Sequence, residues 1–294
     1  MTTSDPIQAA DSIKHTDSIE AKREALLKFI RRWPTCLVAF SAGVDSTVLA
    51  KAAQLALGDG ALAVTGVSRA LPDGELDEAR QLAAQIGIRH EVIETDELAD
   101  PNYVSNSPQR CFHCKNELYG RLSRLAAERK CDVVFSGAIA EDLTDYRPGL
   151  AAAADHRVEH PLAACGFSKL DVRALAVQWQ LPVAEKPASP CLASRIAYGE
   201  EVTPARLAMI DRAEQLLRAA GISPVRVRYH RGDLARIEVP LSALSTFAEP
   251  AFHTWIVEEF SALGFKYITL DLAGFRSGSQ NAVLPVEMLL RSKA

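Results

Sequence analysis

Short apolar runs alternate with amphipathic stretches along the first two thirds of the chain. Buried strands are predicted at residues 35–40, 61–67, 90–93, 132–136 and 181–184, with helices between them at 46–57, 75–86, 115–128 and 170–180. Strands separated by helices in this way are typical of a parallel sheet with crossover connections. The sequence therefore predicts an α/β fold built on a Rossmann-like parallel sheet.

The pattern changes in the last third of the chain. Thr203 and Pro204 form an N-cap and first-turn pair that opens a helix. Two strands of alternating polarity, 225–229 and 234–239, predict a hairpin, and a helical stretch and a strand at 266–272 follow. We therefore expect a disordered tail at 1–20, the parallel-sheet domain at 21–198 and a smaller C-terminal α+β domain at 199–294.

Composition narrows the class of protein. The 294 residues are 48% hydrophobic and 24% charged, and no apolar run is long enough to span a bilayer. The polar first twenty residues do not resemble a signal peptide, so we expect a cytoplasmic protein with no membrane partner. The net charge of −4 argues against a nucleic-acid partner. Six cysteines in such a protein indicate reduced thiols, metal ligands or catalysis, and not a disulfide framework.

The most informative feature is a loop of small residues where the first strand meets the first helix. It consists of Ser41, Ala42, Gly43, Val44, Asp45 and Ser46. Backbone N–H groups in such a turn can face a phosphate. The loop lacks the Gly-Lys-Ser/Thr ending of a Walker loop and the glycine spacing of a dinucleotide fingerprint. A serine-rich helix cap is the simpler alternative.

The loop resembles the PP-loop of ATP pyrophosphatases, Ser-Gly-Gly-x-Asp-Ser, with Ala42 in place of the first glycine. The resemblance implies that this loop binds the pyrophosphate part of ATP while a substrate oxygen attacks the α-phosphate. It also implies that the domain at 21–198 is a PP-loop ATP pyrophosphatase domain.

Longer segments resemble one branch of this superfamily, the LarE sulfur insertases. They are PASPCLASRIAYGEEVT at 187–203, RCFHCKNELY at 110–119, EDLTDYRPGL at 141–150, RVRYHRGDLARIEV at 226–239 and GFKYITLDLAGFRSGS at 264–279. The resemblance implies an ATP- and Mg²⁺-dependent sulfur transferase. Such an enzyme adenylates the carboxylates of pyridinium-3,5-dicarboxylate mononucleotide and converts them to thiocarboxylates for the nickel-pincer nucleotide cofactor of lactate racemase. It further implies a homo-oligomer, a second domain for substrate binding or oligomerisation, and partnership with other assembly proteins of that cofactor.

Two sulfur sources are open. Cys191 matches the donor cysteine of family members that give up their own sulfur, leaving dehydroalanine, and Arg195 is expected to stabilise its thiolate or to bind the adenylate phosphate. A buried structural thiol is the alternative for Cys191. Cys111 and Cys114 form a C-x-x-C pair that fits a redox pair, half a zinc site or two ordinary thiols. Together with Cys191 they supply the three thiolates that hold a [4Fe–4S] cluster with one iron free for sulfide.

Carboxylates and arginines complete the expected site. Asp45 and Asp142 are candidates to hold Mg²⁺, which prefers a few carboxylates plus phosphate oxygens. Asp45 is equally well explained as a helix cap. The family resemblance assigns substrate binding to four residues of the second domain, although strand alternation could instead turn the first two into solvent. They are Arg226, Arg228, Glu238 and Arg276.

The chain also departs from the family pattern. Ala138 and Ile139 stand where the family usually has threonine and asparagine, and Glu159-His160 stands where Arg-Ser is common. These changes leave the identity of the acceptor open. A PP-loop tRNA thiolase, an amide-forming ligase and a non-catalytic nucleotide sensor stay as alternative functions.

Overall fold

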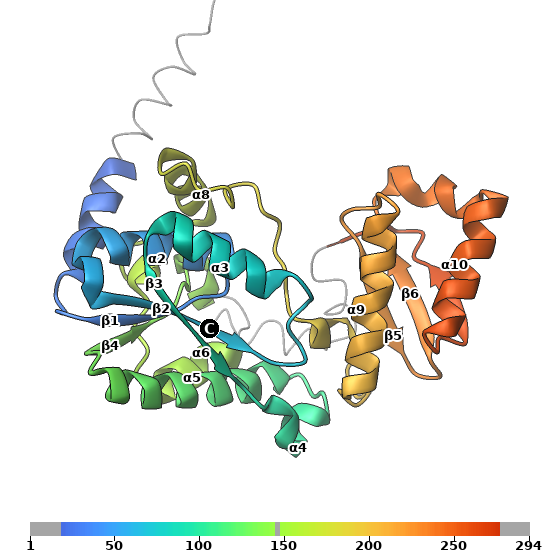
Figure 1. The fold of residues 1–294 in the computed structure, drawn as a ribbon, viewed down its shortest axis with the longest axis horizontal. Coiled ribbons are helices and arrows are strands. Elements are labelled where there is room, and N and C mark those ends of the chain that lie inside the picture. Colours follow the sequence, from blue (N-terminus) through green and yellow to red (C-terminus); the bar gives the residue numbers. More distant parts are fainter. Residues whose placement is uncertain (1–18, 145–147, 277–294) are drawn as a thin grey trace, which may run out of the picture.

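The computed structural model of the chain describes residues 19–144 and 148–276, which form two domains joined along the chain (Figure 1). The larger domain carries a parallel sheet and the smaller one a mixed sheet, as the sequence predicts. Most of the expected tail lies outside the described residues, but residues 19–30 are helical and Ile19 is buried in the core. The folded chain therefore includes residues 19 and 20, which the sequence placed in the tail.

Four strands form the sheet of the larger domain, in the order β3-β2-β1-β4, and every neighbouring pair is parallel. Their bounds are β1 Cys36–Ala39, β2 Ala61–Val67, β3 Arg89–Glu94 and β4 Val133–Phe135. The chain runs outward from β1 through β2 to β3 and then returns to the other side of β1 as β4. In open parallel sheets, ligands bind beyond the carboxyl ends of the strands where the order reverses in this way.

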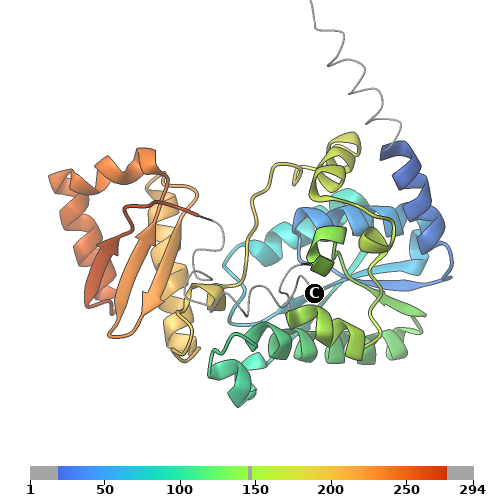
Figure 2. The ribbon, with the colours of Figure 1, turned by 180° about the vertical axis from the view of Figure 1, so that it is seen from behind.

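Helices cover both faces of this sheet (Figures 1 and 2). One face carries residues 19–30 with α2 Val44–Leu57, α3 Glu75–Ile86 and α8 Lys169–Gln178, and the other carries α5 Arg110–Arg129 and α6 Pro148–Asp155. Shorter helical segments connect them: η1 Gly58–Gly60, η2 Glu97–Ala99, α4 Pro101–Val104, η3 Ala140–Thr144, α7 Pro161–Ala164 and η4 Leu192–Arg195.

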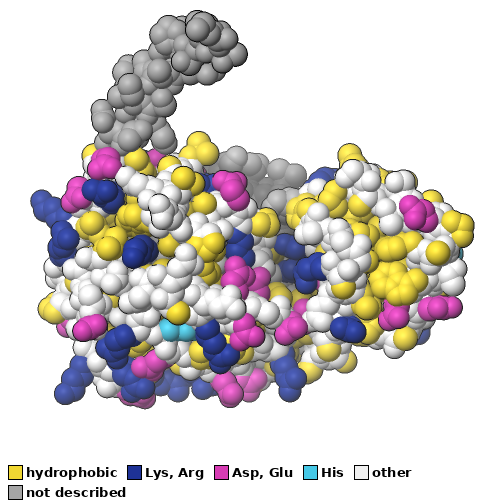
Figure 3. All heavy atoms as spheres, turned by 45° about the horizontal axis from the view of Figure 1, so that its top comes forward, with side chains coloured by type: hydrophobic (Ala, Val, Ile, Leu, Met, Phe, Trp, Pro, Cys, Tyr) yellow, Lys and Arg dark blue, Asp and Glu magenta, His cyan; other side chains and the backbone are white. Residues whose placement is uncertain are grey.

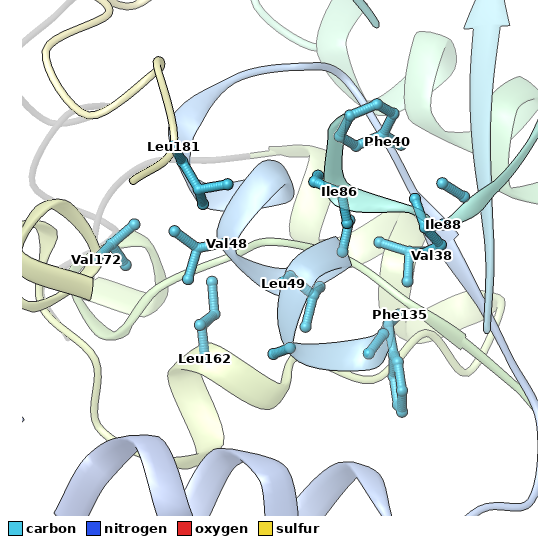
Figure 4. Packing of buried hydrophobic residues seen from close by; sticks show 14 of the residues in the cluster. Val38, Phe40, Val48, Leu49, Ile86, Ile88, Phe135, Leu162, Val172 and Leu181 are labelled. Carbon is cyan, nitrogen blue, oxygen red and sulfur yellow. The ribbon is translucent and has the colours of Figure 1, made fainter. Parts of the chain in front are cut away.

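Each face of the sheet has its own apolar core. Val38 of β1 belongs to one core cluster and Leu37 to the other, because successive strand side chains point to opposite faces. Figure 4 shows the first cluster, in which Val48 and Leu49 of α2 pack among residues of the sheet and of α8 such as Val172. Burial on both faces explains why these strands are apolar along their length.

Residues 181–184 form a turn, and the prediction of a strand there is wrong. The position beside β4 is taken by Glu159, which donates its N–H to Val134 O at 2.9 Å and accepts from Ser136 N at 3.0 Å. Pro182 has no N–H to give to a strand ladder. Leu181 is buried under the helices, so the apolar run reflects core packing and not a strand.

The smaller domain contains a three-stranded sheet in the order β5-β6-β7. Its elements are α9 Pro204–Ala219, β5 Arg226–His230, β6 Leu234–Glu238, η5 Leu241–Ala248, α10 Pro250–Ala262 and β7 Tyr267–Leu270. β5 and β6 are antiparallel, which confirms the predicted hairpin, and β6 and β7 are parallel. The core of this domain also includes Ala70 and Tyr103 of the larger domain.

The surface is mixed in character. Figure 3 shows acidic and basic side chains interspersed over the face in view, and apolar side chains gathered on the smaller domain. Among the described helices, none combines the length and the apolar character that a membrane crossing requires.

Candidate active site

The loop at 41–46 leaves the carboxyl end of β1 and turns directly into α2. Gly43 is the N-cap and gives no side-chain hydrogen bond, so the first N–H groups of the helix are left for a ligand. Ser46 Oγ accepts from Ser41 N at 3.2 Å and donates to Gly43 O at 3.1 Å, which closes the turn. Ala42 has a φ of 56°, a left-handed conformation that costs a residue with a Cβ about 1 kcal/mol. The missing glycine therefore leaves strain in this loop.

A second loop closes against the first from the end of β4. A Cβ atom on Gly137 would lie 2.9 Å from Ser46 N, closer than real Cβ contacts allow, so only glycine fits there. Ala138 lines the site, whereas Ile139 is 5% exposed and packs in the core. Ser136 Oγ and His160 Nδ1 are 2.8 Å apart. Neither Ala138 nor Ile139 supplies a polar side chain here, as the departure from the family pattern predicts.

A cavity of about 480 Å³ brings the two loops together with all three candidate thiols. Among the residues predicted from sequence, its lining includes Ser41, Gly43, Asp45, Ser46, Asp142, Cys111, Cys114 and Cys191. Ala42 and Val44 are buried in the core beneath the loop and are not among the residues that line the cavity. The structure thus joins the nucleotide loop and the thiols in one space.

The thiols sit beside buried cations. Arg110 is 5% exposed and its Nη2 lies 4.0 Å from Cys111 Sγ. Burial, and then the neighbouring Cys191 sulfur, raises the pKa of the Cys114 thiol, and Lys115 opposes this. Cys114 Sγ lies 3.8 Å from Glu97 Oε1. Arg110 was not predicted from the sequence, because nothing in the CxxC segment indicates that its arginine is buried.

Arg195 is fully buried and does not line the cavity. Its Nε donates to Glu214 Oε1 at 3.0 Å, and its Nη1 donates to Cys191 O at 2.9 Å and also to Pro190 O. These bonds fix the backbone that carries Cys191. That Arg195 binds a phosphate or the thiolate stays a prediction, and the geometry favours a positioning role.

The arginines of β5 point inward, and the alternative that they face solvent is wrong. Arg226 Nη2 donates to Ala188 O at 2.9 Å. Arg228 donates to Ser194 O at 3.2 Å and pairs with Glu238 at 2.9 Å. Burial, and then the nearby Arg195, lowers the pKa of Arg226 to about 10. The smaller domain therefore holds the backbone on both sides of Cys191 through hydrogen bonds from Arg226 and Arg228.

Arg276 lies apart from this group. Its side chain is 57% exposed and its Nη2 is 3.6 Å from Asp271 Oδ2, at the end of the described residues. The structure does not bring it to the cavity lining.

The two candidate Mg²⁺ ligands both line the cavity. Lys169 Nζ lies 2.8 Å and 2.7 Å from the two carboxylate oxygens of Asp45, and Asp142 accepts from Ile139 N at 3.1 Å. The N-cap of α2 is Gly43 and Asp45 lies inside the first turn, so the interpretation of Asp45 as the helix cap is wrong. Carboxylates beside a phosphate-binding turn fit the ligand preference of Mg²⁺.

The fit of an iron–sulfur cluster is poorer. Cys111 is exposed and Cys114 and Cys191 are half-buried. Within 19–144 and 148–276, no three His, Cys, Asp or Glu side chains are arranged to hold a metal ion. The thiols share a cavity but are not preassembled as a ligand set.

Three residues of the segment before α5 contribute to the site, although no pattern in the sequence singles them out: two line the cavity and one holds the segment that follows Cys191. Glu97 and Tyr103 line the cavity beside the thiols. Asn106 is fully buried and its Nδ2 donates to the backbone oxygens of residues 196, 197 and 200. Asp100-Pro101 is a recognisable start of a helix in the sequence. The contacts of these three residues are with segments distant in the sequence, so no local pattern reveals them.

Relatives cover nearly the whole chain. An uncharacterized protein of Synechocystis sp. is 44% identical over 266 residues, which are 90% of this chain and 99% of that protein. The pyridinium-3,5-bisthiocarboxylic acid mononucleotide synthase of Lactiplantibacillus plantarum is 37% identical over 91% of this chain and 96% of its own length. The tRNA-specific 2-thiouridylase MnmA of Cereibacter sphaeroides is 28% identical over 60% of this chain and 57% of its own.

No protein-family model matches the chain. The more distant thiouridylase shares the loop-bearing superfamily but covers only part of either protein, whereas the match to the Lactiplantibacillus synthase runs through both domains. The chain is therefore an enzyme that belongs to the LarE family of PP-loop sulfur transferases.

Proposed function

We propose that this enzyme adenylates the carboxylates of a pyridinium-3,5-dicarboxylate mononucleotide with ATP and converts them to thiocarboxylates for the nickel-pincer nucleotide. The single observation that carries the proposal is the cavity that the loop at 41–46 shares with Cys111, Cys114 and Cys191. The similarity to the Lactiplantibacillus synthase supports this choice of substrate.

In the first step, the first turn of α2 binds the phosphates of ATP through its free N–H groups. Asp45 and Asp142 hold Mg²⁺, which neutralises phosphate charge when bound. A carboxylate oxygen of the substrate attacks the α-phosphorus, and pyrophosphate leaves. The product is an acyl adenylate, whose carboxyl carbon now carries a good leaving group.

In the second step, the Cys191 thiolate attacks that carbon and AMP leaves, which gives a thioester. Arg195 holds the Cys191 backbone for this attack, and Arg110 supplies positive charge beside the thiols. Transfer of the Cys191 α-proton to water then leaves the electron pair that forms a Cα=Cβ double bond, and the Cβ–S bond breaks with its electron pair going to sulfur. The thiocarboxylate departs and dehydroalanine remains.

A [4Fe–4S] cluster on Cys111, Cys114 and Cys191 is the second candidate source of sulfur. The shared cavity favours it, and the lack of a preassembled ligand set among the described residues argues against it. We therefore derive the reaction through Cys191 alone and use iron dependence as the test between the two.

Substrate binding is assigned to Arg226, Arg228, Glu238 and Arg276. Arg226 supports the assignment best, because the hydrogen bonds described for its buried guanidinium go only to backbone carbonyls, so it suits an anionic ligand. The homo-oligomer and the partner proteins of cofactor assembly belong to this proposal as well, by family resemblance.

Two kinds of alternative function are less well supported. The thiouridylase relative covers little more than half of each chain, whereas the synthase relative covers nearly all of both. An amide-forming ligase or a nucleotide sensor would not require three thiols in the nucleotide cavity.

Cys191→Ala tests the proposal, with Cys165→Ala as a control that packs outside the cavity. We expect Cys191→Ala to release pyrophosphate in the presence of the substrate but to form no thiocarboxylate. Cys165→Ala should do both. Intact-protein mass spectrometry after turnover should show a loss of about 34 Da from the unmodified chain, the mass of H₂S.

Two results decide between the sulfur sources and the proposal as a whole. An unchanged protein mass with iron-dependent product formation would assign the sulfur to a cluster. Thiocarboxylate formation by Cys191→Ala would remove both sources, because each of them uses Cys191.

A further inference from the structure

The hydroxyl group of Tyr103 is a buried donor that has no partner in the described part of the chain. Its side chain is 1% exposed and lines the cavity that holds the loop at 41–46 and the thiols. Thr47 is in the same state within that part, but it does not line the cavity. An unsatisfied buried hydroxyl costs stability, so its presence at an active site calls for a functional reason.

Tyr103 lies on a short helix that is fastened to the Cys191 segment. Val104 O accepts from Val202 N at 2.9 Å, and Asn106 Nδ2 donates to backbone oxygens within 196–200. Tyr103 also shares an apolar cluster with the half-buried Cys191. The hydroxyl is therefore held at a fixed place relative to the sulfur.

The polar groups nearby do not use this hydroxyl. Glu97 accepts from Ser68 Oγ at 2.9 Å and from Thr95 Oγ1 at 3.1 Å, and Cys114 Sγ lies 3.8 Å from it. The Tyr103 hydroxyl has no such bond within the described residues, and Tyr103 is one of the residues that line the cavity. A ligand bound in the cavity beside Cys191 would supply the acceptor that the described residues do not.

We propose that Tyr103 is a catalytic residue whose hydroxyl donates a hydrogen bond to the carboxyl oxygen of the adenylated substrate. This inference rests on the proposed function, because it needs an acyl adenylate in the cavity. It adds a residue to the sulfur-transfer step only.

The chemistry explains why a donor is needed at this place. When sulfur attacks, a C–S bond forms and the π electrons of the C=O bond move onto the carboxyl oxygen. A donor already aimed at this oxygen stabilises the developing oxyanion. The electron pair on the oxyanion then re-forms the C=O bond, the C–O bond to AMP breaks, and AMP leaves with the electron pair of that broken C–O bond. Tyr103 keeps its proton throughout, so the role is the same for either sulfur source.

Tyr103→Phe tests the inference, because it removes the oxygen and keeps the ring. We expect the single-turnover rate constant for thiocarboxylate formation to fall about 100-fold, as for the loss of one oxyanion donor. Substrate-dependent pyrophosphate release should stay at the wild-type rate. The melting temperature of the ligand-free protein should rise by about 2 °C, since an unsatisfied hydroxyl is gone.

Tyr229→Phe is the matched control. Tyr229 is equally buried, but its hydroxyl donates to Asp233 Oδ1 at 2.7 Å and lies outside the cavity. This variant should melt at a lower temperature and should transfer sulfur at the wild-type rate.

The outcomes separate the inference from the function beneath it. Wild-type sulfur transfer by Tyr103→Phe overturns the inference and leaves the proposed function standing. A lower melting temperature for Tyr103→Phe also overturns it, because the hydroxyl would then be structural. If the wild-type protein releases no pyrophosphate with the substrate, the proposed function itself fails.

Discussion

Asp45 forms an ion pair with Lys169 in the ligand-free protein, and the Lys169 ammonium group competes with the Mg²⁺ that we assign to Asp45. Lys169 Nζ is within 2.8 Å of both Asp45 oxygens, and its side chain is 42% exposed. Pairs as exposed as this contribute about 0.2–1 kcal/mol. For Mg²⁺ to bind, Asp45 must exchange one cation for the other.

Lys169→Gln should therefore lower the Mg²⁺ concentration that gives half-maximal pyrophosphate release, by about threefold at saturating ATP. Lys266→Gln is the control, because Lys266 pairs with Asp233 and neither residue lines the cavity. A titration of the two variants against Mg²⁺ measures the effect. An unchanged or higher Mg²⁺ requirement in Lys169→Gln would show that Asp45 is not a metal ligand.

Single residues also show how far sequence reading could reach into the site. The loop at 41–46 was predicted from residue type and position, since small residues after a buried strand have few other uses. Arg110, the cation beside the thiols, was not predicted. Arg110 and Arg195 each lie near a cysteine in the sequence, and only their three-dimensional contacts distinguish them. The guanidinium of Arg195 donates to Glu214 and to backbone oxygens, whereas Arg110 Nη2 lies 4.0 Å from Cys111 Sγ.

One carboxylate of α8 bonds both to the helix at 19–30 and to the start of its own helix. Asp171 accepts from Lys22 Nζ at 2.5 Å and from Ser168 N at 2.8 Å, and it completes a capping box. Burial alone would raise its pKa, but the hydrogen bonds from Lys22 and Ser168 outweigh burial and lower the pKa of Asp171. A lowered pKa in the folded state means that the ionised form stabilises the fold above about pH 4, the ordinary value for aspartate.

Asp171→Asn should reduce the free energy of unfolding at pH 7 by about 1–2 kcal/mol. This difference from wild type should shrink as the pH falls through the folded-state pKa, because wild-type Asp171 is then protonated too. The exposed Asp155→Asn variant is the control. Urea unfolding at pH 7 and pH 3 measures the difference, and a gap that does not change with pH would contradict the account.

Elements were predictable wherever local signals and core packing agreed. β2 and α3 have the predicted bounds, because Gly87 ends α3 and short turns flank β2. The prediction failed at 181–184, where an apolar run serves the core in a turn. α5 begins at Arg110, before the apolar repeat does, so its first turn shows no helical period in sequence.

The two domains share packing, and this should make them unfold together. The core of the smaller domain includes Ala70 and Tyr103 of the larger one. Gly199 N and Val202 N bond to backbone oxygens of Asn106 and Val104. Unfolding the smaller domain alone would expose this shared core, so partial unfolding is costly.

The three tryptophans report on this coupling, because Trp33 and Trp179 pack against the core of the larger domain and Trp255 against that of the smaller. Trp255→Phe keeps only the tryptophans of the larger domain, and Trp33→Phe/Trp179→Phe keeps only Trp255. When each variant is unfolded in urea, the midpoint from fluorescence should coincide with the midpoint from circular dichroism, which accounts for the variant's own change in stability. ATP with Mg²⁺ at 100 times its dissociation constant should stabilise both reporters by about 2.7 kcal/mol, although the nucleotide loop lies in the larger domain. A Trp255 signal that unfolds first, or that ignores the nucleotide, would show that the domains are independent.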